Sequence, residues 1–132
     1  MHWTRTAVLV KPDGLQRGLI GEIMSRFENK GLKLSGLKML EMTDEMLASW
    51  YEEHKDKSFF DDLVNFMGSM PIIAMSWEGL DAVPVVRKLV GDTLGREAEG
   101  GSIRGDFGMS QQFNLIHASA TEEEAERGAG RV

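Results

Sequence analysis

His117 is the side chain whose type and setting best suit chemistry on a substrate. It lies in N-L-I-H-A-S, residues 114–119, where alternation predicts a strand with Leu115, His117 and Ser119 on one face. Thr121 follows as an expected helix N-cap, so free backbone N–H groups should lie a few residues beyond the imidazole. The ring can act as a nucleophile or an acid–base group, although a lone strand histidine is more often structural.

Other nucleophiles and metal sites have less support in the sequence. The chain has no cysteine, which excludes a thiol nucleophile, a disulfide framework and Cys-ligated zinc or iron–sulfur sites. Only His2 and His54 remain as further imidazoles, so a histidine-based metal site is not expected.

Three positive side chains stand where they could meet an anion. Lys11 opens K-P-D-G after an apolar run, and Arg87 lies on an expected helix. Arg104 is flanked by glycines at 101 and 105, which let backbone approach a ligand closely. Read singly, K-P-D-G is more simply a turn that ends a strand, and each arginine is more simply a solvated charge. Neither a P-loop nor a G-x-G-x-x-G after a strand is present, so a nucleotide would have to be bound by other means.

The overall charge narrows the class of ligand. Fifteen Lys and Arg against 21 Asp and Glu give a net charge of −6, which disfavours nucleic acid as a stable partner. A few converging cations can still bind a small anion. An aromatic pair, Phe59 and Phe60, follows Lys57; it either packs in the core, as most such pairs do, or offers one ring as a stacking surface for a base.

These side chains must be positioned by alternating strands and helices. Apolar runs and turn residues predict strands at 6–10, 32–42, 71–77 and 113–119, and helices at 19–30, from Thr43 to about Lys55, at 59–67, 80–90 and after Thr121. The glycine-rich segment 91–101 reads as a loop. Without the additions the order is β-α-β-β-α-β. We therefore expect an α+β, ferredoxin-like (split βαβ) sandwich, with an antiparallel four-stranded sheet and helices on its faces.

Length and composition fit one globular domain. The chain has 132 residues and a mass of 14.7 kDa, with 42% hydrophobic and 27% charged residues. No apolar run approaches the ~20 residues that cross a bilayer, and the N-terminus has no long apolar stretch of the secretory type. We expect residues 1–132 to form a single domain, located in the cytoplasm, with no membrane partner.

Four ordered segments resemble the nucleoside diphosphate kinase family. They are V-K-P-D-G-L-Q-R-G-L-I-G-E-I at 10–23, A-M-S-W-E-G at 74–79, I-R-G-D-F at 103–107 and N-L-I-H-A-S at 114–119. The resemblance extends over about residues 4–126. It implies an enzyme that transfers the γ-phosphoryl group of a nucleoside triphosphate to a nucleoside diphosphate, by a ping-pong mechanism through a phosphohistidine, and so maintains nucleoside triphosphate pools.

The resemblance also implies roles for the cations. His117 would be the phosphorylated nucleophile, which suits an imidazole that is largely unprotonated near neutral pH. Arg87 and Arg104 would hold phosphate oxygens, with the hydroxyl of Thr93 beside them. Lys11 would reach the ribose hydroxyls and lie near the reacting phosphate.

Further matched positions complete the implied site. Asn114 would contact the ribose, and Phe59 would stack on the base, which allows broad base tolerance among ribo- and deoxynucleotides. Tyr51 matches a tyrosine near the nucleophile, His54 a phosphate contact of some members, and Ser119 a serine of the family's histidine motif.

The resemblance implies a cofactor and an assembly as well. Mg²⁺ would arrive with the nucleotide, bound mostly by phosphates and water and by no direct protein ligand. Members form homo-oligomers, so a tetramer or a hexamer is expected.

Several positions depart from the family pattern. Ala120 replaces an aspartate after the histidine, and Gln111 replaces an aliphatic residue that lines the base. Gly128 stands where the family has a glutamate that orients the histidine. Glu124 lies one turn earlier, and our hypothesis is that Glu124 or a water takes over this role. Alternatively, Glu124 only caps the helix and a backbone carbonyl orients His117.

Two other functions compete with an active kinase. The first is a catalytically weak, nucleotide-binding regulatory member of the same fold, against which the retained site residues argue. The second is an unrelated ferredoxin-like domain that binds RNA or an amino acid. The acidic net charge and the lack of an aromatic RNA-binding pattern argue against RNA.

Overall fold

Strands from both halves of the chain form one antiparallel sheet. The structure is a computed structural model that describes residues 2–54 and 56–132. In this part of the chain the strands are β1 (Trp3–Val10), β2 (Lys33–Leu40), β3 (Ile72–Leu80) and β4 (Ile116–Ala118). They lie in the order β2-β3-β1-β4, with every neighbouring pair antiparallel. The predicted ferredoxin-like class is confirmed.

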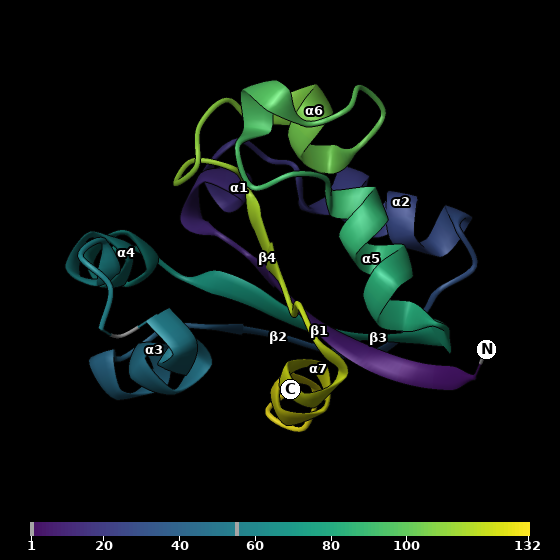
Figure 1. The fold of residues 1–132 in the computed structure, drawn as a ribbon, viewed down its shortest axis with the longest axis horizontal. Helices are drawn as coiled ribbons and strands as arrows, with labels where there is room; N and C mark the ends of the chain where they lie inside the picture. Colours follow the sequence, from purple (N-terminus) through teal and green to yellow (C-terminus); the bar gives the residue numbers. More distant parts are fainter. Residues whose placement is uncertain (1, 55) are drawn as a thin grey trace.

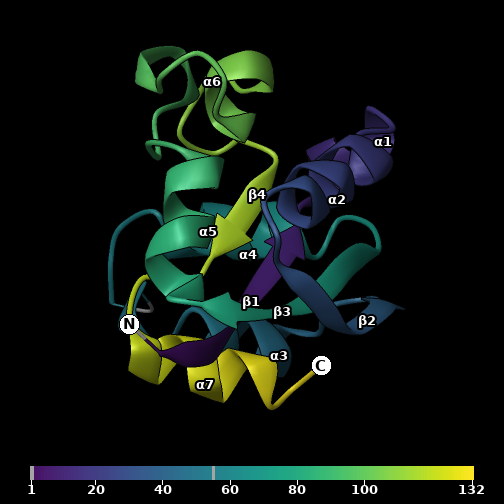
Figure 2. The same cartoon turned by 90° about the vertical axis from the view of Figure 1, so that its right-hand side faces the viewer.

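Helices cover both faces of this sheet (Figures 1 and 2). They are α1 (Pro12–Gln16), α2 (Ile20–Asn29), α3 (Asp44–Trp50), α4 (Phe60–Met67), α5 (Ala82–Val90), α6 (Ile103–Phe107) and α7 (Glu122–Ala129), with short 3₁₀ turns at Glu52–His54 and Gly95–Glu97. Helices α2 and α5 pack on one face, and α3, α4 and α7 on the other. None of the described helices is long and apolar enough to cross a membrane.

The central strand β1 supplies both cores because its side chains alternate between the faces. Val8 and Val10 pack with α2 and α5, whereas Ala7 and Leu9 pack with α3 and α4. All four are completely buried. The strand ends at Val10, and Lys11 follows it directly. The position of Lys11 is therefore set by packing on both faces of the sheet.

Two helix predictions need correction. Thr43 caps α3 as expected, since its Oγ1 accepts a hydrogen bond from the Met46 N–H at 3.2 Å. The helix ends at Trp50, however, and a 3₁₀ turn follows; its expected end at about Lys55 lies outside the described residues. The short helices α1 and α6 were not expected, because their turn and glycine residues predict loops.

The last strand is shorter than the predicted 113–119. Leu115 has φ +77°, a left-handed conformation that interrupts an extended strand, so β4 begins at Ile116. The same turn places Leu115 in the core with Ile116 and Ala118. The prediction that Leu115 shares a face with His117 was therefore wrong.

Candidate active site

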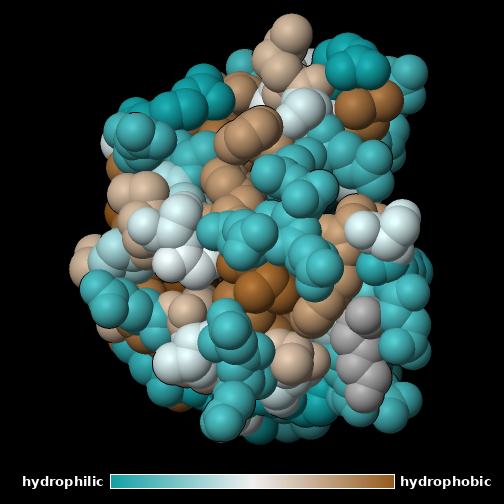
Figure 3. Space-filling model, turned by 90° about the vertical axis from the view of Figure 1, so that its left-hand side faces the viewer, coloured by the Kyte–Doolittle hydropathy of each residue, from teal (hydrophilic) through white to brown (hydrophobic). Residues whose placement is uncertain are grey.

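A cavity of about 490 Å³ gathers nearly all the side chains that the sequence singled out. Every one of the ten predicted site residues except Ser119 lines it: Lys11, Tyr51, His54, Phe59, Arg87, Thr93, Arg104, Asn114 and His117. Lys57, Leu63 and Gln112 also line it and were not predicted. Figure 3 views the side of the molecule that carries α3 and α4, where polar residues border a hollow with apolar residues at its base.

His117 lies on β4 with its ring facing the cavity. Its strand neighbour is Leu9 of β1, and its ring centroid lies 4.8 Å from that of Tyr51. Burial and the nearby positive charges, chiefly Arg104 and then Lys11 and Arg87, lower the pKa of His117 to about 3. The imidazole is therefore neutral at physiological pH and has a free nitrogen lone pair.

The two arginines are fixed by the backbone on either side of His117. Arg104 donates to the Ile116 carbonyl at 2.6 Å and to the Gly91 carbonyl at 3.1 Å, and Arg87 donates to the Ala118 carbonyl at 3.2 Å. Burial, with repulsion from Arg87, lowers the pKa of Arg104 to about 10, so it stays charged at neutral pH. Two cations thus converge on one imidazole.

Lys11 and Asn114 form a buried polar pair beside them. Lys11 Nζ donates to Asn114 Oδ1 at 2.9 Å and to the Gln112 carbonyl at 2.5 Å. The Asn114 amide donates to the carbonyls of Thr93 at 2.7 Å and Gln111 at 2.8 Å. Asn114 therefore joins the Lys11 ammonium to the loop that carries Thr93. Burial lowers the pKa of Lys11 to about 8.

Asp13 holds the turn before His117, a role that the sequence analysis missed. Its Oδ2 accepts from the Leu115 N–H at 3.0 Å, and the Lys11 N–H donates to the Leu115 carbonyl at 2.8 Å. A Cβ at Gly14 would lie 2.9 Å from that carbonyl oxygen and 2.7 Å from Val10 Cγ1, so the turn requires glycine. K-P-D-G thus shapes the approach to β4 as well as supplying a cation. The sequence signal was an acid three residues after the strand, in the turn K-P-D-G.

Aromatic rings lead from His117 to the mouth of the cavity. The ring centroids of Tyr51 and His54 are 6.2 Å apart, and those of His54 and Phe59 are 5.7 Å apart. Phe59 is 43% exposed, which leaves ring surface free, and Lys57 Nζ lies 5.7 Å from its centroid. Phe59 thus presents an accessible ring rather than packing in the core.

Comparison with known proteins decides the family. The family model described as "Nucleoside diphosphate kinase" matches residues 4–131. The chain belongs to the nucleoside diphosphate kinase family. A curated nucleoside diphosphate kinase of Staphylothermus marinus is 54% identical over 127 residues, which span 96% of this chain and 90% of that protein. The resemblance of the four sequence segments is therefore confirmed.

Solved structures of the family agree with the fold. A halophilic nucleoside diphosphate kinase from Halobacterium salinarum, in complex with CDP, has a TM-score of 0.93 and 50% identity, covering 98% of this chain and 86% of that one. The Aquifex aeolicus nucleoside diphosphate kinase has a TM-score of 0.92 and 38% identity, covering 96% and 92%.

Ser119 does not line the cavity of this nucleoside diphosphate kinase family member. It is buried, its backbone N–H donates to the Ala7 carbonyl at 3.2 Å, and its Oγ lies 3.5 Å from the same oxygen. These contacts join the end of β4 to β1. The structure thus gives Ser119 a supporting position, and a direct role in the reaction stays a prediction.

Glu124 makes the contacts of a helix cap. Its carboxylate accepts from the Ala120 N–H at 2.9 Å, and its own N–H donates to Thr121 Oγ1 at 3.1 Å. Glu124 also lines the cavity, but the described hydrogen bonds do not join it to His117. The geometry favours the alternative in which Glu124 only caps α7.

Gly128 lies where a side chain has no room. A Cβ there would stand 2.7 Å from the Ala7 Cβ and 3.1 Å from the Trp50 ring. The glycine lets α7 pack closely against β1 in this chain. A glutamate at position 128 would require α7 to lie farther from the sheet.

Proposed function

We propose that this enzyme transfers the γ-phosphoryl group from a nucleoside triphosphate to a nucleoside diphosphate by a ping-pong mechanism, with His117 as the phosphorylated residue. The observation that carries the proposal is a neutral imidazole between Arg87 and Arg104 in one cavity. A neutral imidazole has the nitrogen lone pair that a nucleophile needs, and the two cations match the negative charge of the phosphoryl group that is transferred.

The first half-reaction forms a bond from an unprotonated His117 nitrogen to the γ-phosphorus. The bond from that phosphorus to the oxygen bridging it to the β-phosphate breaks, and the nucleoside diphosphate leaves with the electron pair. The other ring nitrogen keeps its proton. In the second half-reaction a terminal oxygen of the acceptor diphosphate attacks, and the N–P electron pair returns to the imidazole. One site can serve both steps because they are near mirror images.

The cations act on the charge of the transferring phosphoryl group. Burial and then the charges of Arg104, Lys11 and Arg87 lower the pKa of His117, and the same charges attract the phosphates. The Thr93 hydroxyl adds a donor at the cavity wall. His54 would contact a phosphate, as in some members of the family, and the Tyr51 ring packs on the nucleophile.

The nucleoside is held by surfaces that do not read the edge of its base. Phe59 would stack on the base, and Lys11 with Asn114 would reach the ribose. Ribo- and deoxynucleotides of all bases are the proposed substrates. The Halobacterium relative was solved with CDP, which supports a nucleoside diphosphate as a ligand of this fold.

Magnesium is proposed as part of the substrate. Across residues 2–54 and 56–132, no three His, Cys, Asp or Glu side chains form a metal-binding group. Glu124 is the one acid among the described lining residues, and it is already bonded to a backbone N–H. The cavity instead offers cations suited to phosphates, so Mg²⁺ would be bound mainly by the nucleotide and water.

Labelling with γ-³²P-ATP tests the proposal. We expect an acid-labile, alkali-stable phosphoprotein that passes its label to added nucleoside diphosphate. His117→Ala should abolish labelling and transfer while nucleotide binding stays within about ten-fold, whereas the exposed His2→Ala is a matched control and should behave as wild type. Labelling of His117→Ala would refute the mechanism, and labelling without turnover would favour the regulatory alternative.

We also propose that the enzyme is a homo-oligomer, a tetramer or a hexamer, in the cytoplasm. The supporting feature is β2, which lies at the edge of the described sheet with Leu37 50% and Met39 62% exposed. Light scattering at micromolar concentration should give a mass several times 14.7 kDa; a monomer would refute the proposal.

A further inference from the structure

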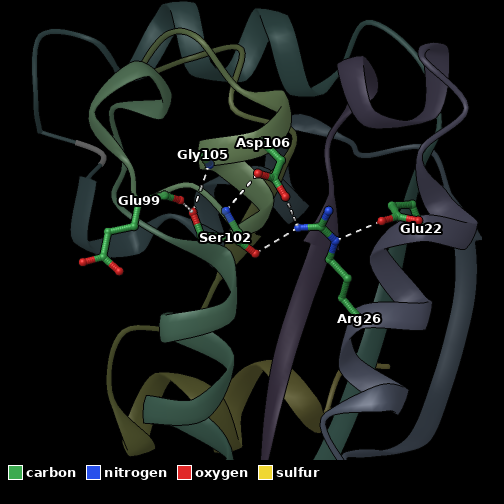
Figure 4. Close-up of polar contacts among 7 residues, drawn as sticks. Glu22, Arg26, Glu99, Ser102, Gly105 and Asp106 are labelled. Carbon is green, nitrogen blue, oxygen red and sulfur yellow. Dashed lines mark hydrogen bonds and ion pairs between the residues drawn. The ribbon is translucent and has the colours of Figure 1, made fainter.

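Arg26 of α2 makes a set of contacts that the proposed chemistry does not use (Figure 4). Its guanidinium pairs with Asp106 Oδ2 at 2.7 Å, donates to the Gly101 carbonyl at 3.1 Å, and pairs with Glu22 Oε1 at 3.1 Å. It also lies 4.9 Å from the centroid of the Phe107 ring. The Arg26 side chain is only 21% exposed. Three of these four contacts are to the segment that contains α6.

Asp106 turns this pairing into a brace for α6. Its second oxygen accepts from the Gly101 N–H at 2.9 Å, and this bond and Arg26 hold the pKa of Asp106 below its usual range. Ser102 caps the same helix, since its Oγ accepts from the Gly105 N–H at 3.0 Å and donates to the Glu99 carbonyl at 2.6 Å. Both ends of the turn before α6 are thus fixed.

The helix needs an external support. It has only five residues, far fewer than the ~12 at which an isolated helix becomes even marginally stable. The surrounding segment is rich in glycine, which raises the entropy lost on ordering it. One α6 side chain, Ile103, is completely buried, whereas the ten-residue α2 has two, Ile23 and Phe27. Arg26 connects the longer helix to the shorter one.

We propose that Arg26 is a positioning residue for Arg104, acting through Asp106 and the helix that carries both. Arg104 lies two residues before Asp106 on α6 and lines the cavity beside His117. The inference rests on the proposed phosphate-binding role of Arg104. A small shift of α6 would move the Arg104 guanidinium off the transferring phosphoryl group, and misplacement by about 1 Å can cost up to ~100-fold in rate.

A second tie limits the expected effect. Arg17 donates to the Phe107 carbonyl at 2.6 Å, so the end of α6 stays attached when Arg26 is changed. We expect Arg26→Gln to lower kcat by about ten-fold, with KM changed less than about three-fold and the fold retained by circular dichroism. Arg26→Lys keeps the charge but loses the forked geometry of the guanidinium, so its kcat should lie between those of the wild type and Arg26→Gln. Glu22→Gln removes only the contact within α2 and should leave kcat at the wild-type value.

A double-mutant cycle separates positioning from general stability. If Arg26 acts through Arg104, Arg26→Gln should cause no further loss in an Arg104→Gln background. Asp106→Asn should reproduce the Arg26→Gln effect, and it replaces that variant if Arg26→Gln does not fold. An equal ten-fold loss in both backgrounds, or an unchanged kcat in the single variants, would overturn the inference. If the wild-type protein is not phosphorylated on His117 by γ-³²P-ATP, the proposed function is refuted instead.

Discussion

Replacing Asp13 by asparagine separates two functions of one buried carboxylate. The carboxylate accepts a hydrogen bond from the Leu115 N–H at 3.0 Å, and its negative charge raises the pKa of the neighbouring Lys11. Asp13→Asn keeps an oxygen to accept that bond and removes the charge. Asp13→Ala removes both. The pair therefore distinguishes the effect on the Leu115 turn from the effect on Lys11.

The expected size follows from the Lys11 ammonium. Burial already lowers the pKa of Lys11 to about 8. About half of the Lys11 side chains are therefore protonated at pH 8. Removing a nearby opposite charge shifts a pKa by about one unit or more. At a pKa near 7, only about a tenth of Lys11 would be protonated at pH 8. If the ammonium is needed for nucleotide binding, kcat/KM at pH 8 should fall about five-fold, and at pH 6 it should change by less than about two-fold.

A pH profile of kcat/KM from pH 6 to 9.5 measures this, because kcat/KM reports ionisations of the free enzyme. The basic limb should move to lower pH in Asp13→Asn. Urea unfolding should show little loss of stability for Asp13→Asn and a loss of about 1–3 kcal/mol for Asp13→Ala, which leaves the buried Leu115 N–H without its acceptor. An unchanged profile, or a loss equal at every pH, would refute the argument.

Three further substitutions test the cavity wall. Gly105→Ala would place a Cβ 1.8 Å from the Glu99 carbonyl oxygen, so α6 must shift and the transfer rate should fall at least ten-fold in a stopped-flow assay; a wild-type rate would contradict the placement of α6. Phe59→Ala should raise KM about ten-fold for ATP, GTP, CTP and UTP alike in steady-state kinetics, since stacking contributes about 1–3 kcal/mol per base; a change confined to one base would argue against stacking. Glu124→Gln keeps an acceptor for the Ala120 N–H, so the transfer rate should stay within about two-fold; a ten-fold fall would instead restore the hypothesis that Glu124 orients the nucleophile.

Local patterns predicted the sheet and most helices because burial in this fold is periodic along the chain. β1 alternates between two cores, and α2 buries Ile23 and Phe27 one helical turn apart. The Thr43 and Thr121 caps were read correctly for the same reason, since a cap is a contact over three residues. Such signals are complete within a short window of sequence.

The errors arise where the conformation depends on a distant partner. Leu115 has a left-handed φ, and its N–H donates to Asp13, about a hundred residues earlier in the chain. Helix α6 is held by Arg26 from another helix. Nothing within a few residues of either segment signals these contacts. The family resemblance predicted which residues form the site. The contacts of Asp13 and Arg26 that hold the site residues in place could be found only in the structure.

The hydrogen-bond partners of the cations differ between the cations that could bind phosphate and the cation that supports the fold. In the cavity, Arg87, Arg104 and Lys11 donate to carbonyl oxygens, of the backbone or of the Asn114 side chain, which orient a positive group without cancelling its charge. Arg26, by contrast, is paired with two carboxylates. A net charge of −6 therefore coexists with a locally positive cavity, because the cavity cations keep their charge for a ligand. Burial and then these same charges lower the pKa of His117, so its imidazole is neutral and can act as a nucleophile toward a phosphate that the cations attract.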